Sequence, residues 1–325
     1  MKTLNHYLKL GEFKLQWSIF VVLVVLFTLF IIGCPKTFLA PDIYYSLMST
    51  IPFMAIMALA LTPVIICAEI DLSFPSIMGF SAWVFVSLSA LTGNPTLALV
   101  ISLITGLLAG LLNGILVVKV GVPSLIVTIG TMFLWRGLIM VCSAGVGKTL
   151  VPVKGTILFK SLVGRIGGVV PAQALWAVAL AFLFWLILNR RKLGSHIYFT
   201  GDNIESARMM GIPVNRVKML VFAQLGFFAA FAGIVASFEM LYYWPTLGEG
   251  SLLKTMASVF LGGTSVFGGM GTIFGTFVGC MIIGSLETGI ISVGLTGFWT
   301  QLIYGLVIVI SVSFHSILRK RGLPA

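Results

Sequence analysis

The sequence predicts an all-α protein that crosses a membrane about ten times. Hydrophobic residues make up 59% of its 325 residues and charged residues only 9%, whereas charged residues are about 25% of an ordinary soluble domain. Apolar windows of the length that spans a bilayer core of about 30 Å recur along almost the whole chain. We therefore expect residues 1–325 to form a single transmembrane domain.

The predicted spans follow one another with short connections, and some are short or interrupted. They cover residues 17–33, 46–68, 75–91, 97–118, 123–142, 173–188, 219–240, 253–267, 271–290 and 298–314. Pro52 and Pro63 lie in the second window, and the eighth runs into the sequence GGTSVFGGMG. Half-helices or re-entrant loops are therefore an alternative to full spans at both places.

Basic residues indicate the orientation, because they are enriched in cytoplasmic loops. With the N-terminus inside, 13 of the 20 lysines and arginines fall on the cytoplasmic side, 6 fall outside, and Arg136 lies within a span. This predicts two cytoplasmic termini, an outer loop over 143–172 and a cytoplasmic loop over 189–218. The outer loop departs from the rule, since it has four basic residues and no acidic one. The net charge of +11 is assigned to anionic lipid headgroups and not to nucleic acid.

The sequence CSAGVGKTL at 142–150 resembles a phosphate-binding loop only superficially. That loop needs a glycine five residues before Gly147, where this chain has Cys142, and a helix directly after Thr149, where Pro152 argues against one. ATP binding by this chain is not predicted. The four cysteines are dispersed and indicate neither a metal site nor a disulfide framework.

Two glycine ladders predict close helix packing. The sequences GLLAGLLNG and GTIFGTFVG place glycines four residues apart, on one face of a helix. Small residues at this spacing allow two helix backbones to approach in a membrane. The packing residues are Gly106, Gly110, Gly114, Gly271, Gly275 and Gly279.

Acidic residues in or near the spans are candidates for a translocation path or gate, because each costs at least about 2.5 kcal/mol at the bilayer centre. They are Glu69, Asp71, Glu239 and Glu287, to which we add Ser73 and Arg136. Asp71 and Ser73 can cap or order the helix that follows, with Pro75 in its first turn, or contact the cargo. Arg136 is expected to pair with one of the four acids. Tyr242, Tyr243 and Trp244 predict an interfacial aromatic belt or a sugar-stacking mouth.

The loop 189–218 contains the signature of a short helix. Asp202 or Asn203 can serve as its N-cap, Glu205 lies in its first turn, and Gly211 followed by Pro213 ends it. We expect this helix to present its remaining side chains to the cytoplasm, namely Ala207, Arg208, Met209 and Met210. So short a helix is marginal alone, so it either packs on its own bundle or docks a soluble partner.

Four motifs in the same order resemble the permease subunits of bacterial ATP-binding-cassette importers for ribose, xylose, galactosides and related solutes. AEIDLSFPS at 68–76 is similar to the family's Gly-Gly-Ile-Asp-Leu-Ser-Val-Gly-Ser, although Glu69 and Pro75 replace two glycines and predict a stiffer, more acidic loop. The other three motifs are VPSLIVTIGTMFLWRGL at 122–138, GDNIESARMMGI at 201–212 and ASVFLGGTSVFGGMGTIFGT at 257–276.

The resemblance implies a permease without a catalytic site or cofactor of its own, in the bacterial inner membrane. Its implied partners are a second permease chain, cytoplasmic ATPase subunits that bind ATP-Mg, and a periplasmic or lipid-anchored solute-binding protein. The implied mechanism is alternating access, and the implied cargo is a simple sugar or sugar alcohol. The implied coupling residues are Gly201, Asp202, Asn203, Glu205, Ala207, Arg208 and Gly211.

Other functions remain as alternatives. An importer of the same class could carry a nucleoside or a furanosyl signalling molecule. An ion-coupled secondary transporter usually has several intramembrane carboxylates or a histidine relay, and the histidines here, His6, His196 and His315, are not central. A membrane-embedded enzyme would need a catalytic cluster such as His-Glu-x-x-His, which the sequence lacks.

Overall fold

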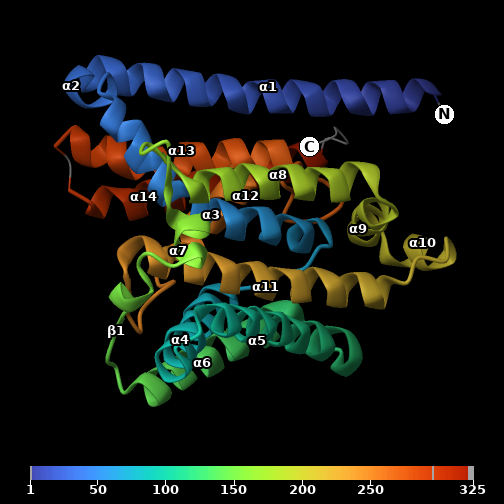
Figure 1. Ribbon diagram of the computed structural model, residues 1–325. Coiled ribbons are helices and arrows are strands. Elements are labelled where there is room, and N and C mark those ends of the chain that lie inside the picture. The colour runs from blue at the N-terminus through green and yellow to red at the C-terminus, as the bar shows by residue number, and fades with distance from the viewer. Residues whose placement is uncertain (1, 295, 321–325) are drawn as a thin grey trace.

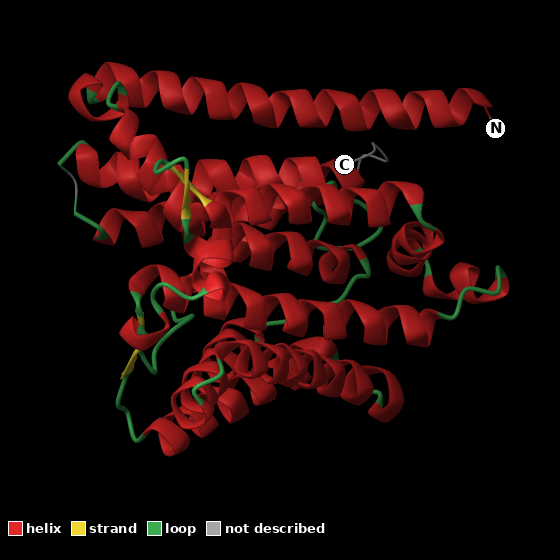
Figure 2. Cartoon of the chain, viewed as in Figure 1, coloured by secondary structure: helices red, strands yellow, loops and turns green. Residues whose placement is uncertain are grey.

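The protein is almost entirely helical (Figures 1 and 2). The structure is a computed structural model that describes residues 2–294 and 296–320. The α-helices in these residues are α1 Lys2–Gly33, α2 Pro35–Phe38, α3 Pro41–Ile66, α4 Phe74–Thr92, α5 Pro95–Ile115, α6 Ser124–Ser143, α7 Ile157–Val163, α8 Ala172–Arg190, α9 Lys192–Asp202, α10 Ile204–Met209, α11 Val214–Met240, α12 Ser251–Leu261, α13 Ile273–Ser292 and α14 Phe298–Lys320. The π-helix Leu116–Val120 extends α5, and a 3-10 helix covers Val151–Val153. Four two-residue strands complete the described elements, β1 Lys148–Thr149, β2 Arg165–Ile166, β3 Val170–Pro171 and β4 Tyr242–Tyr243.

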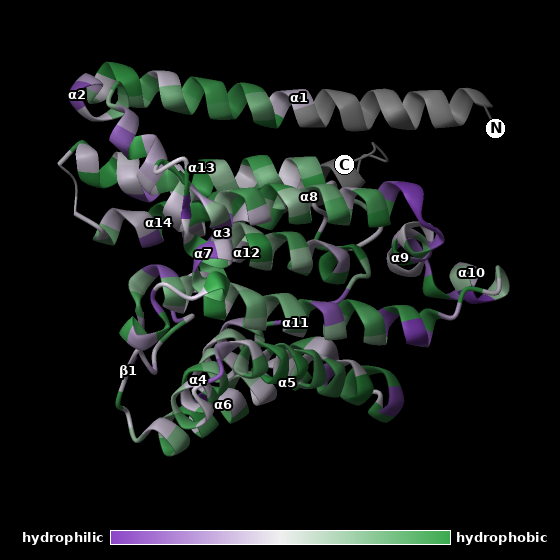
Figure 3. Ribbon diagram, in the orientation of Figure 1, coloured by the Kyte–Doolittle hydropathy of each residue, from purple (hydrophilic) through white to green (hydrophobic). Residues whose placement is uncertain are grey.

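The predicted class, an all-α polytopic membrane protein, is confirmed. Among the described residues, seven helices are long and apolar enough to cross a membrane: α3, α4, α5 with its π extension, α6, α8, α11 and α13. Shorter apolar helical stretches overlap the other three predicted windows: Trp17–Gly33, Ser251–Leu261 and Phe298–Ile310. Hydrophobic residues predominate along the helices (Figure 3), and many of their large side chains are exposed. Phe133 and Val141 of α6, for example, are 67% and 80% exposed, as lipid-facing residues should be.

The structure distinguishes the two windows for which interrupted helices were considered. Helix α3 is continuous through Pro52 and Pro63, so a break there was wrong. Neighbouring helices surround α3 and satisfy part of its backbone, as when Gln224 Nε2 of α11 donates to Ala60 O at 2.6 Å. Helix α12, in contrast, has only 11 residues and ends at Leu261, where the loop 262–272 begins.

Glycines allow α5 and α11 to pack backbone to backbone. A Cβ atom at Gly110 would lie 3.0 Å from Gly226 N, and one at Gly114 would lie 2.9 Å from Met219 Cα. Gly106 lies on the same face of α5, against Gly226 and Ala230. Any larger side chain would therefore force these two helices apart.

The second ladder differs from its prediction at one position. Gly275 and Gly279 of α13 pack against the end of α12, where a Cβ atom at Gly279 would lie 3.2 Å from Gly262 N. Gly271 precedes the first residue of α13 and belongs to the loop 262–272, so it does not share that helix face. The four-residue spacing of the glycines extends to a residue before the helix begins. Helix α13 begins after its N-cap, Thr272, whose side chain accepts a hydrogen bond from Gly275 N at 3.0 Å.

The two ends of the helix bundle carry different elements (Figure 1). One end, which we call the 143–172 end, carries α7 and the two strand pairs, β1 with β4 and β2 with β3. The other, which we call the 189–218 end, carries α9 and α10. Lys148 and Thr149 form strand β1, and the next helical element is the 3-10 helix, so this segment does not have the strand-loop-helix geometry of a phosphate-binding loop.

Candidate functional site

The helix predicted within 189–218 is α10, and a second helix, α9, precedes it. Asn203 is the N-cap of α10, and its side chain accepts a hydrogen bond from Ser206 N at 3.0 Å. Glu205 lies in the first turn, and Gly211 follows the helix with φ of +77°, a conformation that glycine adopts readily. Asp202 is the last residue of α9 and not the N-cap of α10. Helix α9 lacks an acidic first turn and a capping side chain, so no local signal revealed its start.

The exposed surface of α10 differs from the expected one at a single position. Met209 and Met210 are 83% and 54% exposed, and Glu205 and Arg208 are exposed beside them. Ala207 is fully buried and belongs to the main hydrophobic core, so its predicted exposure was wrong. The helix therefore both packs on its own bundle through Ala207 and presents a mixed charged and apolar face.

Helix α9 makes direct backbone contact with the end of α3 and with the loop 262–272. A Cβ atom at Gly201 would lie 2.7 Å from the carbonyl carbon of Ile66 and 2.8 Å from Gly269 N, so only glycine fits there. Gly269 N donates to Ile66 O at 2.8 Å, and the Tyr198 hydroxyl donates to Gly271 O at 2.8 Å. The end of α3, the end of α9 and the loop 262–272 therefore form one junction, which we call the three-segment junction.

The loop between α3 and α4 is fixed by buried polar contacts. Glu69 forms an ion pair with Lys218 of α11. Asp71 is only 1% exposed, and its Oδ1 accepts hydrogen bonds from Ser73 N at 2.6 Å and Ser73 Oγ at 2.7 Å. Asn113 of α5 donates through Nδ2 to Asp71 Oδ2 at 3.1 Å and to Ser73 Oγ at 2.7 Å. Ser73 is the N-cap of α4, and a proline occupies the first turn as predicted, so Asp71 orders the start of this helix.

Arg136 lies near the 143–172 end of α6 and does not pair with any of the four acids considered for it. Its guanidinium donates to Pro245 O at 2.8 Å and to Leu247 O at 3.3 Å, and its Nε lies 3.6 Å from Glu249 Oε1. Arg136 thereby holds the segment after β4 against α6. The predicted partner of Arg136 was wrong because Glu249 lies in a turn-rich loop and therefore was not among the acidic residues assigned to the spans.

The aromatic cluster after α11 is divided between surface and interior. Tyr242 is 44% exposed, whereas Tyr243 is fully buried and therefore lines neither an aromatic belt nor an open mouth. Burial raises the pKa of the Tyr243 phenol above its usual value, although the nearby Arg136 guanidinium lowers it. The Tyr243 hydroxyl consequently stays protonated at neutral pH.

Glu239 and Glu287 also have basic partners at the 143–172 end. Glu239 Oε1 lies 2.9 Å from Arg165 Nη2, and its Oε2 accepts a hydrogen bond from Gln173 Nε2 at 2.8 Å. Glu287 of α13 forms an ion pair with Lys254 of α12. The structure thus brings Asp71 and Ser73 together but keeps Arg136, Glu239 and Glu287 in separate contacts.

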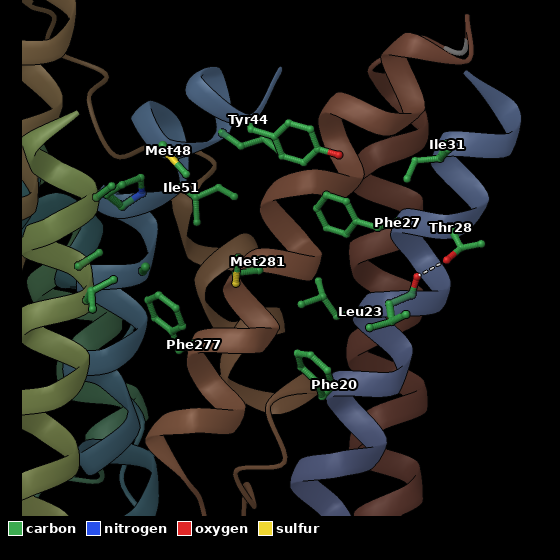
Figure 4. A pocket seen from close by; sticks show the side chains of 17 residues that line it. Phe20, Leu23, Phe27, Thr28, Ile31, Tyr44, Met48, Ile51, Phe277 and Met281 are labelled. Carbon is green, nitrogen blue, oxygen red and sulfur yellow. Dashed lines mark hydrogen bonds between the residues drawn. The ribbon is translucent and has the colours of Figure 1, made fainter. Parts of the chain in front are cut away.

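An apolar cavity of about 570 Å³ lies between α1, α3, α8 and α13 (Figure 4). Phe20, Leu23, Phe27, Phe277 and Met281 are among the apolar side chains that line it. The Thr28 hydroxyl in its wall donates to Val24 O of its own helix at 2.8 Å. This cavity therefore offers little to bind a polar solute. Among the described residues, no group of three metal-ligating side chains could hold a metal ion.

A comparison with known protein families establishes the family. Residues 43–312, from α3 into α14, match the family described as the branched-chain amino acid transport system permease component. The chain belongs to this family of permeases. The match includes the three-segment junction, α9, α10 and all four acidic candidates.

The names of individual relatives of this permease state an imported solute. It is 33% identical over 260 residues to the ribose import permease protein of Escherichia coli strain K12, which covers 79% of this chain and 80% of that protein. It is 33% identical over 307 residues to the ribose import permease protein of Bacillus subtilis strain 168, covering 94% and 91%. The autoinducer 2 import system permease protein LsrD of Salmonella typhi is 28% identical over 313 residues, covering 93% of both chains.

The partners of the acidic residues in this permease could not be identified from sequence. Lys218, Arg165 and Lys254 lie 149, 74 and 33 residues from their carboxylate partners. In the sequence, each of these basic residues lies in a predicted loop or at the end of a predicted span, where cations are common. Asn113 lies within the glycine ladder of α5 and is fully buried. A lone amide among the apolar and small residues of a predicted span was the sequence feature that could have identified it as a partner of Asp71.

Proposed function

We propose that this permease is the membrane-spanning subunit of an ATP-binding-cassette importer that takes up a simple sugar or sugar alcohol. The ribose import permease proteins at 33% identity support the cargo class. The observation that carries the mechanism is the exposed face of α10, which follows α9, the helix whose end packs in the three-segment junction. Motion of α10 would therefore reach α3 and the loop 262–272 through α9, and α11 through the short segment that joins it to α10.

The proposal places ten spans across the bacterial inner membrane, with both termini in the cytoplasm. Seven long apolar helices and three shorter apolar stretches support this number. The 189–218 end is the cytoplasmic end with the coupling loop, and the 143–172 end faces outward. Helix α12 is too short to cross alone, since 11 residues rise about 16 Å, so it crosses together with the loop 262–272.

The coupling residues have two kinds of role in this proposal. Glu205 and Arg208, with Met209, contact the ATPase subunit from the exposed face of α10. The others hold that face in place: Asn203 caps the helix, Ala207 anchors it in the core, Gly211 ends it, and Gly201 and Asp202 join it to the junction. ATP shifts the permease between inward- and outward-facing states only as far as its binding differs between them.

The gate residues lie at both ends of the path. Glu69, Asp71 and Ser73 order the cytoplasmic loop between α3 and α4, whereas Arg136, Glu239 and Glu287 lie at the outer end. All four acids have polar or basic partners, which does not favour the alternative of ion-coupled transport. The partners of this subunit are a second permease chain, ATPase subunits that bind ATP-Mg, and a solute-binding protein. The permease itself binds no cofactor.

Reconstitution tests the proposal. The permease, with its ATPase subunits and a solute-binding protein, is placed in proteoliposomes, and uptake of labelled D-ribose, D-xylose, D-galactose, ribitol and autoinducer 2 is measured beside ATP hydrolysis. We expect uptake of one sugar or sugar alcohol that needs both ATP and the loaded binding protein. Uptake by the permease alone, or of autoinducer 2 only, would overturn the proposal.

A charge reversal tests the coupling helix within the same system. Arg208→Glu or Glu205→Lys should abolish binding-protein-stimulated ATP hydrolysis and uptake while the chain still inserts into the membrane. Lys119→Glu is the matched control, because Lys119 is an exposed cation at the same end of the bundle but lies outside α9 and α10. Normal uptake by both α10 variants would remove the coupling assignment.

A further inference from the structure

A second cavity, of about 500 Å³, lies at the outer end between α3, α12 and α13. Unlike the apolar cavity of Figure 4, its wall combines hydroxyl, ammonium and carboxylate groups with apolar side chains such as Phe53 and Ile291. Its polar lining residues are Thr50, Glu249, Ser251, Lys254, Glu287, Thr288 and Ser292. Cavities of roughly 300 to 1,000 Å³ with a few polar groups are typical of small-molecule sites.

The central polar feature of this cavity is the Lys254–Glu287 ion pair. Lys254 lies in the first turn of α12, and Glu287 lies five residues before the end of α13, about 7.5 Å below it. Ionisable side chains within membrane-spanning segments are rare and usually functional. Their side chains are 33% and 42% exposed, so the pair is not sealed within the protein core. An ammonium has three donors and a carboxylate about four acceptor positions, so both can bind further groups.

Further contacts in the cavity wall set the positions of these groups. Lys254 Nζ lies 5.9 Å from the centroid of the Tyr304 ring, whose π electrons attract the positively charged ammonium group. Glu249 lies in the wall of the cavity and reaches Arg136 on its other side. The cavity is therefore joined to α6 and α14 as well as to the helices that enclose it.

We propose that this cavity holds the neutral polyhydroxylated cargo transiently after the binding protein releases it, with Lys254 and Glu287 bonded to its hydroxyl groups. This inference rests on the proposed function and adds a site to it. A neutral polyol supplies both donors and acceptors, which matches the alternating ammonium, carboxylates and hydroxyls of the wall. A phosphorylated sugar is disfavoured, because the two cations at this wall, Lys254 and Arg136, are already paired with Glu287 and Glu249.

Blocking the cavity tests the site directly. In the reconstituted complex, Thr288→Cys introduces a thiol into the cavity wall, on a Cys142→Ser background that removes the exposed native thiol of α6. A membrane-impermeant, positively charged methanethiosulfonate is then added from outside. We expect uptake of the cargo sugar to fall at least tenfold after the reagent, relative to the same variant before it, while ATP hydrolysis continues. The Cys142→Ser protein alone is the control and should keep its uptake.

A second pair of variants separates cargo contact from a structural ion pair. Glu287→Gln should raise the KM for uptake at least tenfold, with assembly of the complex unchanged. The charge exchange, Lys254→Glu combined with Glu287→Lys, should have the melting temperature of the unmodified complex, because the ion pair is re-formed. Its KM for uptake should nevertheless stay raised. A KM that recovers with the exchange, together with unchanged uptake after labelling at position 288, would overturn the inference. If no sugar is taken up by the unmodified complex, it is the proposed function itself that fails.

Discussion

Lys218, near the start of α11, forms an ion pair with Glu69, in the loop between α3 and α4. Both side chains are largely buried, at 14% and 9% exposure. Lys218 lies nine residues after the last residue of α10, and Glu69 lies three residues after Ile66, whose backbone contacts Gly201. The coupling loop is therefore attached to the end of α3 and the residues after it at two places, by backbone packing at Gly201 and by charge at Lys218.

Breaking this ion pair from one side should destabilise the permease strongly. Lys218→Met leaves the Glu69 carboxylate buried without its cation, which costs about 3 to 5 kcal/mol for a buried pair. The measurement is the free energy of unfolding of the purified chain in detergent, for both single variants and for Lys218→Met combined with Glu69→Leu. We expect the double variant to be more stable than Lys218→Met alone. If the loss of unfolding free energy in the double variant equals the sum of the losses in the two single variants, the two residues do not interact.

The buried amide of Asn113 should be required for the loop before α4. Asn113→Leu removes the donor to Asp71 and Ser73 at a fully buried position, so we expect a loss of about 1 to 3 kcal/mol of stability. Asn189→Leu is the control, because that exposed asparagine bonds only within its own helix, to Trp185 O. Equal melting temperatures for the Asn113 variant and the wild type would contradict the role of this contact.

Helix packing predicts opposite outcomes at two glycines. Gly110→Ala places a methyl group against Gly226 N and the Phe222 carbonyl of α11, so the two helix backbones must move apart. We expect the variant to lose about 1 to 3 kcal/mol of unfolding free energy. Gly130→Ala in α6 meets nothing within 4 Å, so it should be neutral or slightly stabilising, because alanine favours the helix. Thermal unfolding of the two variants in one detergent checks this, and a smaller loss at Gly110 than at Gly130 would refute it.

The membrane fold could be predicted because it depends on local composition. Every predicted window overlaps a helix, although the window 253–267 runs past the end of α12, since a bilayer requires apolar helices whose backbone is satisfied internally. Errors arose where neighbours outweighed local signals. Helix α3 runs through Pro52 and Pro63 because surrounding helices support it, and Gly271 lies outside α13 because Thr272 caps the helix after it.

The candidate site was predictable only in part, for the same reason. The caps and stops of α10 are local, so Asn203, Glu205 and Gly211 could be assigned from the sequence. Long-range partners are not local: nothing near Glu69 or Glu287 in the sequence points to Lys218 or Lys254. The burial of Ala207 likewise depends on how α10 lies against the bundle, which a helix of six residues does not encode alone.

Residues on opposite faces of α10 should separate folding from partner binding. Ala207→Leu adds three heavy atoms to a fully buried position, so it should lower the melting temperature of the permease itself, by overpacking that costs about 1 to 3 kcal/mol. Met209→Asp changes a side chain that is 83% exposed and should leave the melting temperature unchanged while weakening ATPase binding at least tenfold. Differential scanning fluorimetry and pull-down of the ATPase subunits measure the two effects. If Met209→Asp lowered the melting temperature as much as Ala207→Leu, the face assigned to the partner would instead belong to the bundle.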